Sequence, residues 1–289
     1  MISQTERIDL HMHTTVSDGT DRPEELLPKI REKGINLFSV TDHDDVKACR
    51  IVRLLRKEGD PLFLSGVEFS CRDEMGRYHI LGYGYDADAE AMRRIIEKRH
   101  ALRMTKLQAR LDYIKREFGL SFSENEIREL RSMDNPGKPH IGKLIVKHGY
   151  AESITQAINK YINGLRVSNL LLKPEEAIQS ILDAGGIPVL AHPPFGDGDE
   201  LVIGEELEMR LRHVLAFGLQ GVEAFYSGYT PEQHAEVLGL AEKYGLYVTA
   251  GSDYHGTNKP VVLGDTGMDG CRDWPEGLKR FLTAAMEKI

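Results

Sequence analysis

Eight histidine and acidic residues fall at or just after the ends of predicted β-strands, and a ninth, Asp18, follows the first of them closely. Imidazole and carboxylate are the ligands that first-row divalent metals prefer. Strand residues two apart point to the same side, so His11-Met12-His13 and Asp253-Tyr254-His255 each direct two ligands to one point. The pattern predicts a multinuclear metal centre and therefore hydrolysis. The nine residues are His11, His13, Asp18, His43, Glu68, His79, His192, Asp253 and His255.

Such a centre favours hydrolysis of phosphate esters. Two cations about 3.5–4 Å apart acidify a bridging water, and the resulting hydroxide is expected to attack phosphorus in line. The leaving alkoxide needs a proton, for which His255 and a metal-bound water are both candidates. Because a carboxylate can bridge two cations, Glu68 and Asp253 are further catalytic candidates. The mixed nitrogen and oxygen ligands favour two or three Mn²⁺, Fe²⁺ or Zn²⁺ ions, with Mg²⁺ as an alternative.

The elements that position these residues alternate between short apolar runs and helical patterns. Lys33-Gly34, Gly185-Gly186 and Tyr244-Gly245 each predict the end of a helix that leads into the next strand. Repeated β-α units favour a parallel sheet, and ligands from many strand ends favour its closure into a barrel. No glycine-rich nucleotide-binding loop follows a strand. Strands are predicted at 7–11, 36–41, 62–69, 78–83, 187–192, 221–225 and 246–251.

The stretch 88–172 interrupts this alternation. It begins with a long helical pattern at 89–118, whose apolar stripe comprises Leu107, Leu111, Ile114 and Phe118. We therefore expect a helical subdomain, inserted between the fourth and fifth strands, that caps the substrate. Residues 1–87 and 173–289 are expected to form the barrel.

Composition sets further bounds. The 289 residues carry a formal net charge of −8, which argues against a protein that coats nucleic acid. No apolar run is long enough to span a bilayer, and no secretory signal is visible. Three cysteines without paired spacing argue against a disulfide framework. A cytoplasmic protein that binds neither a membrane nor a stable nucleic-acid partner is expected. The oligomeric state is left open.

Several motifs together resemble the PHP (polymerase and histidinol phosphatase) superfamily, and they run through both ends of the chain. Its insertion resembles that of the TrpH/YciV-like small phosphoesterases, with Lys138-Pro139-His140-Ile141 where that branch has Arg-Pro-His-Ile. The motifs are Asp9-Leu10-His11-Met12-His13-Thr14, Ser17-Asp18-Gly19, Thr41-Asp42-His43-Asp44, Gly66-Val67-Glu68, His79-Ile80-Leu81-Gly82-Tyr83, Ala191-His192-Pro193 and Gly251-Ser252-Asp253-Tyr254-His255-Gly256.

The resemblance implies an α/β fold, a distorted (β/α)7 barrel, with three metal positions. His11, His13, Glu68 and Asp253 would hold the first ion. His79 and His192 would hold the second, with Glu68 bridging to it. Asp18, His43 and His255 would hold the third. Asp42 is either an acid that orients a ligand histidine or a cap of the turn after the second strand.

Basic residues of the insertion are candidates for substrate binding. Between 93 and 110 there are seven basic residues and one acid. Arg99, Arg103, Lys106 and Arg110 share one helix face by their spacing, and a solvated face is the alternative interpretation. Lys138 and His140 precede a helical pattern, and a helix N-terminus favours phosphate. Lysine lacks the planar fork of the family's arginine. Ser227 after the sixth strand is a further candidate.

The leading hypothesis is a metal-dependent phosphoesterase acting on a small phosphorylated substrate, either a nucleoside phosphate or bisphosphate or a cyclic phosphodiester. The alternatives are a 5′-3′ exonuclease acting on short oligonucleotides and a histidinol-phosphate phosphatase. A polymerase-associated domain, a non-catalytic metal module and an amidohydrolase are less favoured. Amidohydrolases often use a lysine after the fourth strand, where this chain has none.

Overall fold

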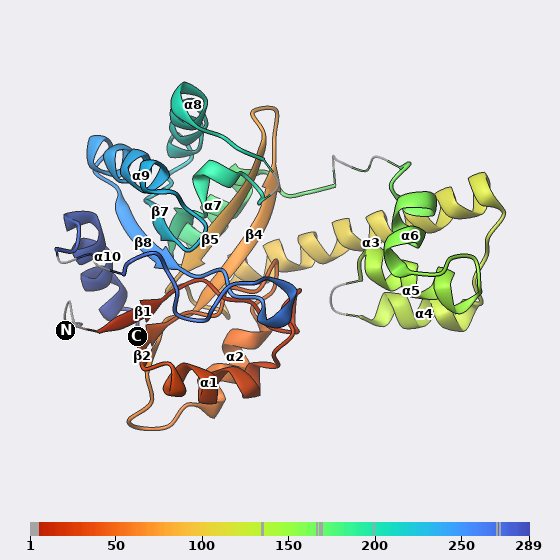
Figure 1. Ribbon diagram of the computed structural model, residues 1–289, viewed down its shortest axis with the longest axis horizontal. Helices are drawn as coiled ribbons and strands as arrows, with labels where there is room; N and C mark the ends of the chain where they lie inside the picture. The colour runs from red at the N-terminus through yellow and green to blue at the C-terminus, as the bar shows by residue number, and fades with distance from the viewer. Residues whose placement is uncertain are drawn as a thin grey trace. The chain divides into compact units, whose positions relative to one another are not determined.

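The computed structural model describes residues 6–289 except 134, 135, 166, 168, 169, 199, 270 and 272. The chain divides into two compact units. Unit 1 comprises Met1–Ile95 and Leu172–Ile289, and unit 2 comprises Ile96–Leu171. Both sheets belong to unit 1, so the described chain is a mixed α/β protein (Figure 1). None of the described helices combines the length and the apolar character needed to cross a membrane.

The strands of unit 1 form two sheets. A three-stranded parallel sheet has the order β1-β2-β3, and a five-stranded mixed sheet has the order β4-β5-β6-β7-β8. Backbone hydrogen bonds also connect the sheets, since the amide of Leu10 donates to Ala250 O at 2.9 Å and the amide of Glu68 donates to Asp42 O, just beyond the first sheet, at 3.3 Å. The strands are β1 Arg7–Asp9, β2 Ile35–Phe38, β3 Leu62–Phe63, β4 Gly66–Arg72, β5 Arg77–Tyr83, β6 Ile187–Leu190, β7 Gly221–Tyr226 and β8 Tyr247–Gly251.

Two features depart from repeated parallel β-α units. The strand predicted at 62–69 is two strands in different sheets, since the chain leaves β3 after Phe63 and β4 begins at Gly66. In addition, β5 runs antiparallel to both β4 and β6. Only four residues, 73–76, connect β4 to β5, and a parallel pairing needs a much longer crossover. His79 therefore lies near the start of its strand rather than near the end.

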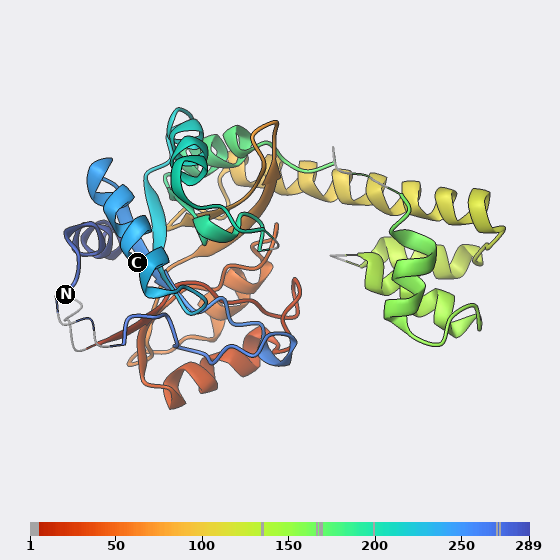
Figure 2. The ribbon, with the colours of Figure 1, turned by 45° about the horizontal axis from the view of Figure 1, so that its top comes forward.

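Helices pack against these sheets. Figures 1 and 2 show α1 and α2 near β1 and β2, and buried residues of α1, α2 and β2 share one apolar core. On the other sheet, α9 contacts β7 and β8, and α10 contacts β8. Most strand residues on the covered sides are apolar and buried. The helical segments are α1 Pro23–Glu32, α2 Lys47–Leu55, α7 Pro174–Asp183, η2 Pro193–Phe195, α8 Gly204–Leu215, α9 Pro231–Lys243, η3 Gly256–Asn258 and α10 Glu276–Met286.

Three of these helices end as the glycine signals predict. Gly34, Gly185 and Gly245 follow α1, α7 and α9 with φ values of 63°, 73° and 63°. Glycine adopts this left-handed conformation at little cost, so the chain leaves the helix there and enters β2, β6 or β8 within a few residues. The predicted connections from helix to strand are confirmed at these three sites.

Unit 2 is helical. Its helix α3, Glu90–Phe118, begins within unit 1 and agrees closely with the predicted helix at 89–118. Leu107, Leu111 and Ile114 are buried as expected, but Phe118 is 38% exposed because it ends the helix. The remaining segments of unit 2 are α4 Glu124–Ser132, α5 Lys138–Lys147, α6 Ile154–Ala157 and η1 Ile158–Ile162, which share one apolar core with α3.

Candidate metal centre

Glu68, in β4, offers its two carboxylate oxygens to two different groups of imidazoles. Its Oε2 atom lies 3.1–3.2 Å from nitrogens of His11, His13 and His43. Its Oε1 atom lies 2.9 Å from His79 Nδ1 and 3.2 Å from His192 Nε2. Glu68 is 1% exposed. A buried carboxylate surrounded in this way can serve two adjacent cations.

The first cluster brings together four donors from three segments of the chain. His11 Nε2 and His13 Nε2 lie 3.2 Å apart, and Asp253 Oδ1 is 3.5 Å and 3.2 Å from them. Glu68 Oε2 completes the group. Four ligands about 2.1 Å from a tetrahedral ion lie about 3.4 Å from one another. The donor separations therefore fit a single divalent ion.

The second cluster consists of Glu68 Oε1, His79 Nδ1 and His192 Nε2. The two imidazole nitrogens lie 3.3 Å apart, so the three atoms form a nearly regular triangle. His79 reaches this cluster because β5 runs antiparallel to β6, which places the beginning of β5 beside the carboxyl end of β6. Three protein ligands leave positions open for water or substrate.

The third cluster is more open. His255 Nε2 lies 3.3 Å from Asp18 Oδ1, and His43 Nε2 lies 3.8 Å from Asp18 Oδ2. His13 Nδ1 is also close to Asp18, at 3.5 Å. The side chain of Asp18 is 54% exposed, whereas His255 is buried. His255 Nδ1 lies 2.8 Å from the carbonyl oxygen of Asp253, which can only accept, so the ring proton is on Nδ1 and Nε2 faces Asp18 as a ligand.

Unmet hydrogen bonds support a role in metal binding. Glu68 Oε2 and His43 Nδ1 are both buried and lack a hydrogen bond of acceptable geometry, although they lie 3.2 Å apart. Buried polar atoms are rarely left without a partner. An imidazole and carboxylate donor set with these orphaned atoms fits divalent cations of the Mn²⁺, Fe²⁺ and Zn²⁺ type.

The candidate ligands shift one another's pKa values. Burial alone would raise the pKa of Glu68, but the surrounding histidines, His79 and His11 first, hold it well below its usual range. Burial alone would lower the pKa of His13, but Asp253 and Glu68 raise it to about 9. Burial lowers the pKa of His43 to about 3. A bound cation replaces protons on such imidazoles.

Two ligand candidates occupy an uncommon backbone conformation. Asp253 has a φ of 58° and His192 a φ of 25°, in the left-handed region that non-glycine residues seldom adopt. Hydrogen bonds support both positions, because the amide of Asp253 donates to His11 O at 2.8 Å and the amide of His192 donates to Glu223 Oε2 at 2.9 Å. Such local strain is characteristic of functional sites.

Sequence reasoning missed Glu223 and Asp9, two acids within the strands. Glu223 accepts from His11 Nδ1 at 3.0 Å, which directs His11 Nε2 into the first cluster. Asp9 accepts from the amide and hydroxyl of Ser252 at 2.9 and 2.7 Å and so anchors the segment before Asp253. Burial raises the pKa of Asp9 to about 6, against these hydrogen bonds. The available signal was an acid inside an apolar strand, as in Gly221-Val222-Glu223-Ala224-Phe225.

The structure places Asp42 and Ser227 beside the clusters in supporting positions. Asp42 accepts from the amide and hydroxyl of Thr14 at 2.7 Å and from Ser17 Oγ at 2.6 Å, and Ser17 Oγ lies 3.3 Å from His13 Nδ1. Asp42 thus holds the loop after His13 and reaches that histidine through Ser17. The hydroxyl of Ser227 donates to Ser252 O at 3.0 Å, which secures the loop that carries Asp253.

The remaining substrate-binding candidates lie in unit 2. Burial and the nearby Arg103 lower the pKa of Arg110, and burial, Lys143 and Arg103 lower that of His140. These shifts identify a concentration of positive charge between α3 and α5. His140 Nδ1 accepts from the amide of Gly137 at 3.0 Å, while Lys138 donates to Asn163 Oδ1 at 2.7 Å. Arg99 is 5% exposed.

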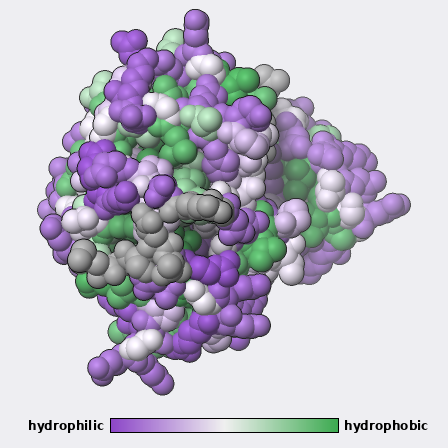
Figure 3. Space-filling view, turned by 60° about the vertical axis from the view of Figure 1, so that its left-hand side comes forward, coloured by the Kyte–Doolittle hydropathy of each residue, from purple (hydrophilic) through white to green (hydrophobic). Residues whose placement is uncertain are grey.

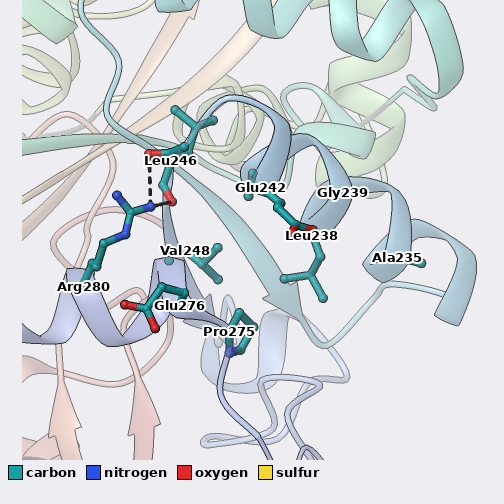
Figure 4. A pocket seen from close by; sticks show the side chains of 12 residues that line it. Ala235, Leu238, Gly239, Glu242, Leu246, Val248, Pro275, Glu276 and Arg280 are labelled. Atoms are coloured by element: carbon teal, nitrogen blue, oxygen red, sulfur yellow. Dashed lines mark hydrogen bonds between the residues drawn. The ribbon is translucent and has the colours of Figure 1, made fainter.

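A surface pocket of about 770 Å³ lies elsewhere in unit 1, between α9, the beginning of β8 and α10 (Figure 4). Leu238, Val248 and Pro275 provide apolar lining, and Arg280 donates to the carbonyl oxygens of Gly245 and Leu246. Figure 3 shows the surface on the side of α9 and α10, where hydrophobic patches lie among hydrophilic residues. None of the nine candidate ligands lines the pocket, so it is separate from the clusters.

A family model described as "PHP domain" matches residues 9–172. The chain belongs to the PHP domain family. The matched segment contains the first six candidate ligands, from His11 to His79, and the fold brings His192, Asp253 and His255 to the same clusters. The resemblance inferred from the motifs is therefore confirmed.

Similar curated proteins act on phosphate esters. The chain is 29% identical to a phosphoribosyl 1,2-cyclic phosphate 1,2-diphosphodiesterase of Eggerthella lenta, over 86% of this chain and 94% of that protein. It is 28% identical to a 3′,5′-nucleoside bisphosphate phosphatase of Chromobacterium violaceum, over 86% of this chain and 87% of that protein. It is 26% identical to a 5′-3′ exoribonuclease of Haemophilus influenzae, over 87% of this chain and 90% of that protein. PHP proteins of this length thus differ in substrate.

Among solved structures, a proposed metal-dependent phosphoesterase from Bifidobacterium adolescentis matches with a TM-score of 0.73. The two chains are 25% identical, and the match covers 96% of each. The PHP chain therefore shares its mixed α/β fold with that protein across both units.

Proposed function

We propose that this chain is a metal-dependent phosphoesterase that hydrolyses a small phosphorylated substrate. The observation that carries the proposal is the position of Glu68, whose two oxygens face two separate groups of imidazoles. The donor separations fit two adjacent divalent ions, and Asp18, His43 and His255 provide a third, more open position. When bound, such ions act as Lewis acids toward a phosphoryl oxygen and lower the pKa of water.

The protein residues have distinct roles in this proposal. His11, His13 and Asp253 would hold the first ion, His79 and His192 would hold the second, and Glu68 would be shared between them. His255 acts as a ligand through Nε2, because its Nδ1 proton is directed at the carbonyl oxygen of Asp253. A distorted (β/α)7 barrel would keep these strand ends together, and the backbone hydrogen bonds between the two sheets favour such closure.

The substrate class follows from charge. The relatives include enzymes for a cyclic phosphodiester and for a nucleoside bisphosphate, both compact and anionic. The basic residues Arg103, Arg110 and Lys143 of unit 2 would bind a second anionic group of the substrate, since arginine recognises phosphate through several donors. We therefore favour a nucleoside bisphosphate or a cyclic phosphodiester over a simple phosphomonoester.

The test is a panel assay on protein stripped of metal and reloaded with Mn²⁺, Fe²⁺ or Zn²⁺. The panel contains an aryl phosphate, a 3′,5′-nucleoside bisphosphate, a cyclic phosphodiester and a 5′-phosphorylated oligonucleotide. Hydrolysis in ¹⁸O-labelled water is expected to place the label in the phosphate product, which shows cleavage at phosphorus. Absence of turnover on all four substrates with every metal would refute the proposal.

A further inference from the structure

Glu223 contacts residues of the first and the second cluster without being one of their candidate ligands. Its Oε1 atom lies 3.0 Å from His11 Nδ1, and its Oε2 atom accepts the backbone amide of His192 at 2.9 Å. His11 offers its other nitrogen to the first cluster, and His192 offers Nε2 to the second. One carboxylate thus supports a ligand of each cluster.

The surroundings leave Glu223 little freedom. The exposed fraction of Glu223 is 0%. Gly251, in the adjacent strand β8, has no side chain and so leaves room for Glu223 and His11 to approach each other. A Cβ atom at Gly251 would lie 2.4 Å from Glu223 Oε1 and 2.2 Å from His11 Cβ, closer than real contacts allow. The glycine is therefore required for the approach of Glu223 to His11. A movement of the Glu223 carboxylate that alters its contact with His11 must therefore also disturb its hydrogen bond with the amide of His192.

Glu223 contacts a side-chain ring at His11 and a backbone amide at His192, so the two contacts have different effects. Toward His11, Glu223 keeps the ring proton on Nδ1 and so leaves Nε2 available as a ligand. Toward His192, it holds the amide of a residue whose φ is 25°. A strained backbone persists only where its surroundings hold it in place. When Glu223 is held in place, it therefore orients the His11 ring in the first cluster and the His192 backbone in the second.

We propose that Glu223 is a positioning residue that couples metal binding at the first cluster to metal binding at the second. The inference rests on the metal centre of the proposed function and adds a property to it. An ion that orders His11 also orders Glu223 and thereby His192, so each ion raises the affinity of the other cluster. Such coupling is reciprocal by thermodynamic necessity.

The test compares three variants by metal content at a free Mn²⁺ concentration that just saturates the wild type. Glu223→Gln keeps the shape but loses the negative charge and one of the two acceptor oxygens, because its second terminal atom is a donor. It is expected to lose two ions, with roughly 10–100-fold weaker binding at each. His79→Ala removes a ligand of the second cluster, so it is expected to lose that ion and, because the coupling is reciprocal, to bind the first ion more weakly.

Glu208→Gln provides the matched control. Glu208 also accepts two hydrogen bonds, from Lys243 and Tyr244, but it lies in α8 and belongs to none of the three clusters. This variant is expected to keep the metal content of the wild type. Loss of one ion or none in Glu223→Gln would overturn the coupling while leaving the metal centre intact. A wild type that binds no ion would overturn both.

A second measurement does not depend on how well a variant folds. In wild-type protein loaded with Zn²⁺ and labelled with ¹⁵N-histidine, His11 is expected to carry its proton on Nδ1, protected from exchange by Glu223. A proton on Nε2, or rapid exchange at Nδ1, would overturn the role of Glu223. Calorimetric titration of the same wild-type protein with Zn²⁺ is expected to show positive cooperativity between two sites, and independent binding would contradict the proposal.

Discussion

The phenol oxygen of Tyr226 donates a hydrogen bond of 2.9 Å to Asp253 Oδ2, whereas Oδ1 of the same carboxylate faces His11 and His13. Lys259 Nζ approaches Oδ2 as well, at 2.6 Å. The two oxygens of Asp253 are thus divided between the protein and the first cluster. This division fixes the orientation in which Asp253 offers Oδ1.

Tyr226→Phe is therefore expected to weaken metal binding at the first cluster by about 10-fold, because outer hydrogen bonds orient metal ligands. Competition with a chelator measures the change, and Tyr244→Phe, which alters a hydroxyl bonded to Glu208, is the control. Lys259→Met is a less direct test, since it also removes a positive charge that opposes cation binding. Unchanged affinity in Tyr226→Phe would show that the phenol is not needed to orient Asp253.

Glu68→Gln is expected to abolish turnover and to reduce bound metal by at least one ion. The amide lacks the charge and the second acceptor oxygen needed to face both imidazole groups. Elemental analysis and turnover on the best substrate of the panel are measured together, with Glu208→Gln as the control. Turnover at the wild-type rate would exclude a bridging role for Glu68.

Asp253→Asn and His255→Ala are expected to differ in how much bound metal and kcat they lose. Asp253→Asn removes charge from the first cluster, so both metal content and kcat are expected to fall strongly. His255→Ala opens only the third cluster, where Asp18 is already half exposed, and is expected to lose at most one ion. Full metal content and near-normal kcat in both variants would mean that this pair of residues is structural.

Arg103→Ala is expected to raise KM for a bisphosphorylated substrate more than it lowers kcat. A contact with a distant phosphate is present in the ground state and in the transition state alike. A charge-assisted hydrogen bond contributes roughly 1.5–3 kcal/mol, or about 10–150-fold in kcat/KM. An aryl phosphate serves as the comparison. Equal losses on both substrates would instead place Arg103 at the reacting phosphoryl group.

Unit 2 is expected to lose stability in acid through Glu126. This carboxylate accepts hydrogen bonds from Lys147, from Ser123 at the start of α4 and from His148, which hold its pKa well below the ordinary value of 4.5. A lowered pKa stabilises the folded state fully above the unfolded pKa, and this stabilisation is lost as the pH falls from there through the folded pKa. The free energies of unfolding in urea of the wild type and Glu126→Gln should therefore differ at pH 7, and the difference should begin to shrink only as the pH falls below about 4.5. A constant difference would contradict this role.

The sequence by itself determined which residues can bind metal and how the helices of unit 1 lead into strands. His11 and His13, like Asp253 and His255, are recognisable pairs because residues two apart share one side of an extended chain. The glycines after α1, α7 and α9 are equally local signals, because the left-handed conformation favours glycine at any position. These features depend on near neighbours in the chain, which a single sequence displays.

The tertiary structure alone decided how the ligands are grouped and supported. The reversal of β5, which brings the start of that strand to His192, follows from its pairing with β4 and β6. Glu223 and Asp9 resemble any acid within a strand until their partners, 212 residues away for Glu223 and 243 for Asp9, are known. Hydrogen bonding and burial at such separations depend on packing in three dimensions, and no local periodicity records them.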